Sequence, residues 1–233
     1  MSKITVYPDK ESLISGTADF IAELAAQAIA ARGRFTLALS GGNTPRPVYA
    51  RLATAGYRDR IDWSKVHLMV KTALFDQAPL LEGNIHRIRG EDAPEQAAAD
   101  YAKVLQHTFG GDAAAGNPPP EGFDLILLGM GDNGHTASLF PGLAVVTEPV
   151  RWVMAQYVEV VGMWRITMTP VVINAARQVA FLVSGANKAE MLHRVLEGPY
   201  QPVVLPSQII KPTRGELRWL LDAPAAAQLR RES

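Results

Sequence analysis

The sequence predicts an α/β protein with a mostly parallel sheet that carries helices on both faces, in one catalytic domain of residues 1–233. Three observations lead to this fold class. Short apolar runs, typical of strands, alternate along the chain with longer segments of helical periodicity. Several of these runs are apolar throughout, as expected for strands buried on both faces. Three of them end in glycine-bearing turns, "LALSGGNTP", "LILLGMGDNGH" and "FLVSGANKAE".

The first half of the chain gives strands and helices in alternation. The helix at 9–32 carries apolar residues at helical spacing and meets a stop signal at Gly33. The turn "SGGNTP" leads into a second helix with Pro45 near its first turn, where proline is favoured. The remaining expected elements are strands at 3–7, 34–40, 65–70 and 84–88, and helices at 71–80 and 93–109.

The second half continues the alternation after a loop at 110–122 that is rich in glycine, proline and alanine. "FDLILLGMG" is the most apolar strand of the chain. The other expected elements are strands at 151–158, 164–169, 178–185 and 216–222, helices at 170–176 and 187–198, and a short terminal helix. In such a sheet ligands bind beyond the carboxyl ends of the strands, so the three glycine-bearing turns are candidates for a site.

Composition excludes several function classes. The chain has no cysteine, which rules out a disulfide scaffold, a thiolate metal site and a cysteine nucleophile. With 23 basic and 23 acidic residues the net charge is zero, which argues against a nucleic-acid binder held by long-range charge. No signal peptide and no apolar run of about 18 residues is visible, so we expect a cytoplasmic protein with no membrane partner.

The turn at residues 40–45 has the composition of a phosphate cradle. Gly41 and Gly42 let the backbone approach an anion, and Ser40, Asn43 and Thr44 add hydrogen-bonding side chains. An ordinary strand-to-helix turn with Thr44 as the helix cap would have the same composition. The stretch is neither a Walker A motif nor a GxGxxG motif.

Two cations lie near the other candidate turns. Lys188 stands at the start of a helix, where the helix dipole disfavours a cation, which is understandable if it faces a bound anion. A solvated surface lysine is an equally good interpretation. Arg165 lies in an otherwise apolar run, on the same strand face as Thr167 and Thr169. A buried arginine needs an anionic partner, either a carboxylate such as Glu159 or a substrate phosphate.

His135 is the best-placed histidine, because it follows Gly134 at the carboxyl end of the most apolar strand. Its ordinary pKa of about 6.5 suits it to proton transfer near neutral pH. The other four histidines are expected to be structural or solvated, and none forms a pair with metal-ligand spacing. Ser40 and Ser138 lack a GxSxG elbow or an obvious triad order.

Taken together, these motifs resemble the 6-phosphogluconolactonases. The resemblance rests on "LALSGGNTPRPVYARLA", "FDLILLGMGDNGHTASLFPG", "WRITMTPVVINAARQVAFLVSGANKAEMLHRVLEG" and "LPSQIIKPTRGELRWLLD", in that order over almost the whole chain. It implies a Rossmann-like fold similar to that of glucosamine-6-phosphate deaminases and ribose-5-phosphate isomerases. It also implies hydrolysis of 6-phospho-D-glucono-1,5-lactone in the oxidative pentose phosphate pathway, without metal or organic cofactor.

The resemblance also assigns roles to residues. His135 would be the general base that activates water, and the substrate phosphate would be held by the 40–44 turn, Arg165 and Lys188. The expected partner is the phosphosugar lactone alone, and the expected assembly is a monomer or weak homodimer.

Two departures from the family pattern stand out. Many relatives have "DGH" where this chain has Asn133, Gly134 and His135. An asparagine can hydrogen-bond the imidazole but supplies no charge, and Asp132 could compensate only if the turn lets it. Relatives also carry a "GDER" stretch and a long loop after the strand that here reads "KVHLMV". We therefore expect that a segment found in relatives is missing around Leu68–Lys71, either deleted or a mobile loop absent from the printed sequence.

Two other functions compete with the lactonase. An amino-sugar phosphate deaminase or isomerase would share the phosphate turns, but deaminases carry a glutamate shortly after the histidine, and "TASLFPG" contains no acid. A catalytically weak or silent sugar-phosphate binding protein is suggested by Asn133 and by the missing segment.

Overall fold

The computed structural model describes residues 2–69 and 78–230. Its main sheet has seven parallel strands in the order β1-β9-β8-β5-β2-β3-β4. The strands are β1 (Lys3–Tyr7), β2 (Phe35–Ala38), β3 (Val66–Met69), β4 (Ile85–His86), β5 (Leu125–Leu128), β8 (Gln178–Val183) and β9 (Glu216–Asp222). The chain runs outward from β2 to β3 and β4 on one side, and from β5 to β8 and β9 on the other. β2 and β5 therefore flank the topological switch point, where ligands bind in such sheets.

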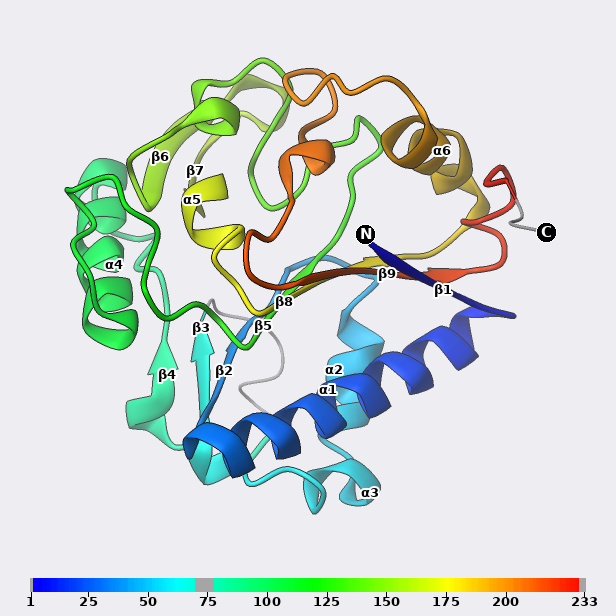
Figure 1. Cartoon of the computed structure of the whole chain (residues 1–233), viewed down its shortest axis with the longest axis horizontal. Coiled ribbons are helices and arrows are strands. Elements are labelled where there is room, and N and C mark those ends of the chain that lie inside the picture. Colours follow the sequence, from blue (N-terminus) through cyan, green and yellow to red (C-terminus); the bar gives the residue numbers. More distant parts are fainter. Residues whose placement is uncertain (1, 70–77, 231–233) are drawn as a thin grey trace.

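Helices cover both faces, as the sequence predicts (Figure 1). The helices are α1 (Lys10–Arg32), α2 (Arg46–Leu52), α3 (Ala55–Arg58), α4 (Pro94–Phe109), α5 (Pro170–Ile173) and α6 (Ala189–Glu197). α1 and α2 lie on one face, over a core that includes Phe35 and Leu37 of β2. α4, α5 and α6 lie on the other face, over a core that includes Phe181 and Trp219. Buried strands with apolar side chains on both sides explain the unbroken apolar runs of the sequence.

α1 begins and ends where its sequence signals lie. The Asp9 side chain accepts a hydrogen bond from the backbone N–H of Ser12, and Gly33 adopts the left-handed conformation at φ 74°. The helix is long and apolar enough to cross a membrane by length and composition. Its apolar residues, among them Leu13, Ile21 and Ala25, are buried against the sheet, so it is a core helix of this domain.

The two expected strands around residues 151–169 form a separate antiparallel pair, β6 (Val153–Val158) and β7 (Met163–Met168). This hairpin packs on α4 and stands above the main sheet (Figure 1). A tight turn at Gly162, with φ 63°, follows the short Glu159–Val161 segment. Because the outer part of β7 is not inside the main sheet, Arg165 is exposed. The expectation of a buried-strand arginine is therefore wrong.

Three other expectations need correction or fall outside the structure. Residues after β9 form turns from Ala223 to Leu229 instead of a short terminal helix within the described part of the chain. Pro45, not Thr44, is the residue before α2, and no side chain caps this helix. The expected helix at 71–80 falls mostly on residues 70–77, outside the described residues, as does the end of the segment Leu68–Lys71.

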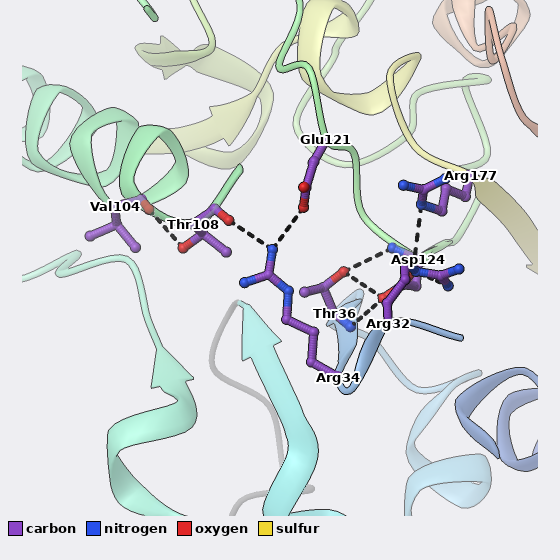
Figure 2. Close-up of polar contacts among 8 residues, drawn as sticks. All are labelled: Arg32, Arg34, Thr36, Val104, Thr108, Glu121, Asp124 and Arg177. Atoms are coloured by element: carbon purple, nitrogen blue, oxygen red, sulfur yellow. Dashed lines mark hydrogen bonds and ion pairs between the residues drawn. The ribbon is translucent and has the colours of Figure 1, made fainter. Parts of the chain in front are cut away.

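A buried carboxylate joins β2 and β5 at the edge of the sheet opposite the glycine turns. Asp124, 4% exposed, accepts hydrogen bonds from Arg32 Nε and Nη2 at 3.0 and 2.6 Å, and from Thr36 N and Oγ1 at 2.8 and 2.9 Å (Figure 2). Arg177 lies 3.7 Å away. Charged hydrogen bonds of this kind offset the cost of burying the carboxylate. They also fix the start of β5 against β2.

Candidate active site

A cavity of about 640 Å³ lies at the carboxyl ends of β2 and β5, the place that the switch point predicts. The structure brings the candidate residues from four distant parts of the chain to this one cavity. Its lining includes Ser40, Gly41, Gly42, Asn43, Thr44, His135, Arg165 and Lys188. Asn133 and Asp132 are not part of the lining. Trp164 and Ile88 also line it; sequence reasoning missed both, because neither lies in a turn or carries a charge.

The imidazole of His135 is held between backbone and an aromatic ring. A side chain on Gly131 would place its Cβ 2.1 Å from the imidazole, so the turn requires glycine at that position. Phe140 stacks on the imidazole, with ring centroids 4.1 Å apart and an interplanar angle of 17°. Gly131 N donates to His135 O at 2.8 Å, which closes the turn. Gly134, at φ 76°, packs against Leu205, where a Cβ would lie 2.9 Å from a methyl group.

Asn133 sets the tautomer of His135. Its Oδ1 lies 3.2 Å from the backbone nitrogen of His135 and 2.6 Å from Nδ1 of the same residue. A backbone N–H can only donate, so the atom facing it must be the amide oxygen. That oxygen can only accept, so the proton of the neutral imidazole lies on Nδ1. The lone pair is therefore on Nε2, the nitrogen that is free to take a proton.

The surroundings keep His135 neutral. Partial burial, followed by the nearby charges of Lys188 and Arg165, lowers its pKa below the ordinary value of 6.5. Asp132 acts in the opposite direction and raises the pKa of His135, but its effect is the smallest of the four. A neutral imidazole at physiological pH is the form that a general base needs.

Asp132 contacts Lys188 rather than His135. Lys188 Nζ lies 2.5 Å from Asp132 Oδ1, and Asn187 Nδ2 lies 3.5 Å from the same oxygen. The ion pair lowers the pKa of Asp132. Lys188 itself occupies the last position of a short helical turn, Ala186–Lys188, directly before α6, as the sequence predicts. Its side chain is only 18% exposed, so the interpretation as a solvated surface lysine is wrong.

Arg165 enters the cavity from β7. Its Nε donates to Ser138 Oγ at 3.3 Å and its Nη1 lies 3.6 Å from Met163 Sδ, and among the described residues it forms no ion pair with Glu159. Gln156, directly opposite Arg165 in the hairpin, donates to the backbone carbonyl of Ser138 at 2.6 Å. The hairpin and the His135 turn are thus joined through Ser138. The guanidinium keeps donors for an anion in the cavity.

The turn after β2 leaves its glycines open. Gly42 has φ 105°, a conformation that favours glycine, and neither Gly41 nor Gly42 has an atom within 4 Å of an added Cβ. Tyr49 Oη donates to the backbone carbonyl of Ser40 at 2.9 Å and anchors the turn to α2. The turn lines the same cavity as the cations, and the candidate cradle residues are therefore where the sequence places them.

The other histidines lie away from this cavity. His67 of β3 and His86 of β4 face each other, with Nδ1 of His67 and Nε2 of His86 3.3 Å apart. His193 pairs with Glu197 at 3.1 Å, and His107 is exposed on α4. Over residues 2–69 and 78–230, no group of three or more histidine and acidic side chains could hold a metal ion.

Comparison with known proteins gives a consistent result. The model of the family described as glucosamine-6-phosphate isomerases/6-phosphogluconolactonase matches residues 8–71 and 68–219. The two matched segments meet at 68–71, where the sequence departs from the pattern of relatives. A relative from Nostoc sp. named 6-phosphogluconolactonase is 38% identical over 245 residues, covering 97% of this chain and 98% of the relative.

Solved structures agree with the fold. The crystal structure of devB protein has a TM-score of 0.86 and 29% identity, and the match covers 99% of this chain and all of that one. A monomeric glucosamine-6-phosphate deaminase has a TM-score of 0.77 at 18% identity, covering 97% of this chain and 99% of its own, which shows a shared fold. The chain belongs to the glucosamine-6-phosphate isomerase/6-phosphogluconolactonase family.

Proposed function

We propose that this chain is a 6-phosphogluconolactonase that hydrolyses 6-phospho-D-glucono-1,5-lactone to 6-phosphogluconate in the oxidative pentose phosphate pathway. Its curated relatives carry this name over nearly their full length. The observation that carries the proposal is a neutral imidazole with its Nε2 lone pair free, placed in a cavity that also holds two cations and a glycine turn.

In the proposed mechanism Nε2 of His135 takes a proton from water as the water oxygen attacks the lactone carbonyl. The tetrahedral intermediate then collapses, the bond from the carbonyl carbon to the ring oxygen breaks, and the ring oxygen receives the proton from His135. The product is a carboxylic acid, which loses its proton to solvent. Asn133 positions the imidazole through Nδ1. General-base assistance of this kind contributes about 10²–10⁴-fold.

The phosphate of the substrate is proposed to lie between the cradle of residues 40–44 and the cations Arg165 and Lys188. Backbone N–H groups and glycines suit the close approach of an anion, and a guanidinium can bind two phosphate oxygens at once. No step requires a metal or an organic cofactor. The cytoplasm is the proposed site of action, with a monomer or weak homodimer as the working assembly.

A direct assay tests the proposal. The lactone is generated in situ and its hydrolysis is followed by base uptake, with the spontaneous rate subtracted. We expect His135→Asn to lose about 10²–10⁴-fold in rate while still binding 6-phosphogluconate. His107→Asn, on exposed α4, is the matched control and should retain full rate.

The assay also decides between the competing functions. Phosphosugar binding without any acceleration over spontaneous hydrolysis would favour a silent binding protein. Ammonia release from glucosamine 6-phosphate would favour a deaminase, although residues 136–142 supply no acidic side chain for that chemistry.

A further inference from the structure

The pairing of Asp132 with Lys188 has a consequence for ligand exchange. Lys188 lines the cavity and its side chain is mostly buried, whereas Asp132 is outside the lining and its side chain is 77% exposed. Lys188, the proposed phosphate ligand, is therefore already paired with the carboxylate of Asp132, which lies outside the cavity lining. An entering anion must compete with that carboxylate for the ammonium group.

The competition favours phosphate. A phosphate monoester carries about −1.5 to −2 charges and three acceptor oxygens, against one charge and two oxygens for a carboxylate. Asp132 can also return to water at little cost, because it is exposed and its recorded side-chain contacts are with Lys188 and Asn187 alone among the described residues. Because the Asp132 end of the pair is exposed to solvent, screening weakens the pair and the carboxylate can be exchanged.

We propose that Asp132 is an exchangeable counter-ion of Lys188, which the substrate phosphate displaces and which recaptures Lys188 as the product leaves. This inference rests on the proposed function, because it takes Lys188 to be a phosphate ligand. It gives Asp132 a role distinct from that of Asn133, which contacts the imidazole directly.

The reaction itself makes this counter-ion useful. Hydrolysis converts a neutral ester into a carboxylate, so the product carries one more negative charge than the substrate, close to His135. Asp132 is three residues before His135, and its charge is felt at the imidazole. It therefore repels the new carboxylate while it competes for Lys188. Both effects weaken the binding of 6-phosphogluconate more than that of a ligand with phosphate alone.

The experiment uses Asp132→Asn, Lys188→Met and the double variant. Asp59→Asn is the control, because it changes the net charge equally at an exposed residue that ends α3 and does not line the cavity. Dissociation constants for inorganic phosphate and for 6-phosphogluconate are measured by calorimetry. We expect Asp132→Asn to tighten phosphate binding about three- to tenfold, and 6-phosphogluconate binding by more. In the Lys188→Met background the tightening of phosphate should vanish, because the competition no longer exists. Asp59→Asn should change neither constant.

The outcomes separate this inference from the proposed function. If Lys188→Met weakens phosphate but Asp132→Asn does not tighten it, the counter-ion role is wrong and the phosphate site stands. If Asp132→Asn weakens phosphate, Asp132 positions Lys188 instead of competing for it, and the inference is overturned. If Lys188→Met leaves phosphate binding unchanged, Lys188 is not a phosphate ligand and the assignment of the phosphate site fails as well.

Discussion

The contact between Asn133 and His135 makes the substitution Asn133→Asp a sharp test of the site. The amide oxygen lies 2.6 Å from Nδ1, so an aspartate in the same rotamer places a carboxylate oxygen on the same proton. The hydrogen bond and the tautomer are kept, and only a negative charge is added. The substitution therefore separates the orienting role of residue 133 from an electrostatic one.

The expected magnitude follows from this distance. An opposite charge within about 4–6 Å shifts a pKa by about 1–3 units toward the charged form, and the partial exposure of the site places this case at about 1–2 units. The present pKa of His135 is below 6.5, mainly because of burial and the charge of Lys188. The base is active when it is neutral, so the rate falls as pH drops below this pKa. The acid limb of the profile should thus move to higher pH in Asn133→Asp.

The plateau rate should rise at the same time. One pKa unit corresponds to 1.36 kcal/mol, which limits the gain from a better-stabilised imidazolium to about tenfold per unit. The measurement is kcat/KM between about pH 5 and 8, with lactone generated in situ and spontaneous hydrolysis subtracted. Asn133→Ala removes the oxygen that accepts the hydrogen bond from Nδ1 of His135, and we expect kcat/KM to fall at every pH.

A matched control is Asn117→Asp, which adds the same charge on the exposed loop at 110–122 and should leave the profile unchanged. An acid limb that stays within about 0.3 units of the parent in Asn133→Asp would refute the reasoning, because a charge on the proton of Nδ1 cannot leave the pKa of His135 unaltered. A limb that moves to lower pH would do so as well.

Four further predictions concern the turn, the sheet, the histidine pair and metals. Gly131→Ala should lower kcat by about 10²-fold with little change in melting temperature, because its Cβ would displace the imidazole. Asp124→Ala should lower the free energy of unfolding by about 3 kcal/mol, because Arg32 and Thr36 lose their hydrogen-bond acceptor. By calorimetry this corresponds to a fall of about 6–12 °C in melting temperature, and a fall under about 2 °C would count against a buried clamp. Burial lowers the pKa of both His67 and His86, so the free energy of unfolding should fall as pH drops below about 6.5. Replacing both histidines with glutamine should reduce this pH dependence in denaturant titrations. EDTA dialysis should leave hydrolysis unchanged; a loss restored by added metal would contradict the proposed chemistry.

The sequence carries most of the fold because its local signals agree with one another. The bounds of α1 follow from Asp9 and Gly33, and β9 coincides with its apolar run at 216–222. The hairpin at 153–168 was harder to place. The alternation of its side chains predicts the two strands. It does not predict that they pair with each other and pack on α4, because local periodicity carries no information on which segments are neighbours in space. The exposure of Arg165 follows from that placement.

The candidate site shows a similar division. Glycine turns and His135 could be located from the sequence, because parallel strands bring their carboxyl ends to one edge. The partner of Asp132 could not, since Lys188 lies far along the chain and the two meet only when β5 and β8 pair. Phe140 and Gln156 were missed for the same reason. Each acts on the site through a neighbour in space that has no fixed sequence spacing.

The clamp formed by Asp124 also fixes the distance between the two turns that follow β2 and β5. The glycine cradle follows β2 and the proposed base follows β5, and these two strands are hydrogen-bonded neighbours in which Leu37 faces Leu125 and Ala38 faces Ile126. Adjacent strands lie about 4.8 Å apart, and a sheet resists change in that spacing. With Thr36 tied to Asp124, β2 cannot slip along β5 either. In the proposed mechanism, the distance between the bound phosphate and the attacked carbonyl is then fixed by the backbone hydrogen bonds between β2 and β5. The enzyme would then select among sugar lactones by the number of carbons between the phosphate and the lactone carbonyl.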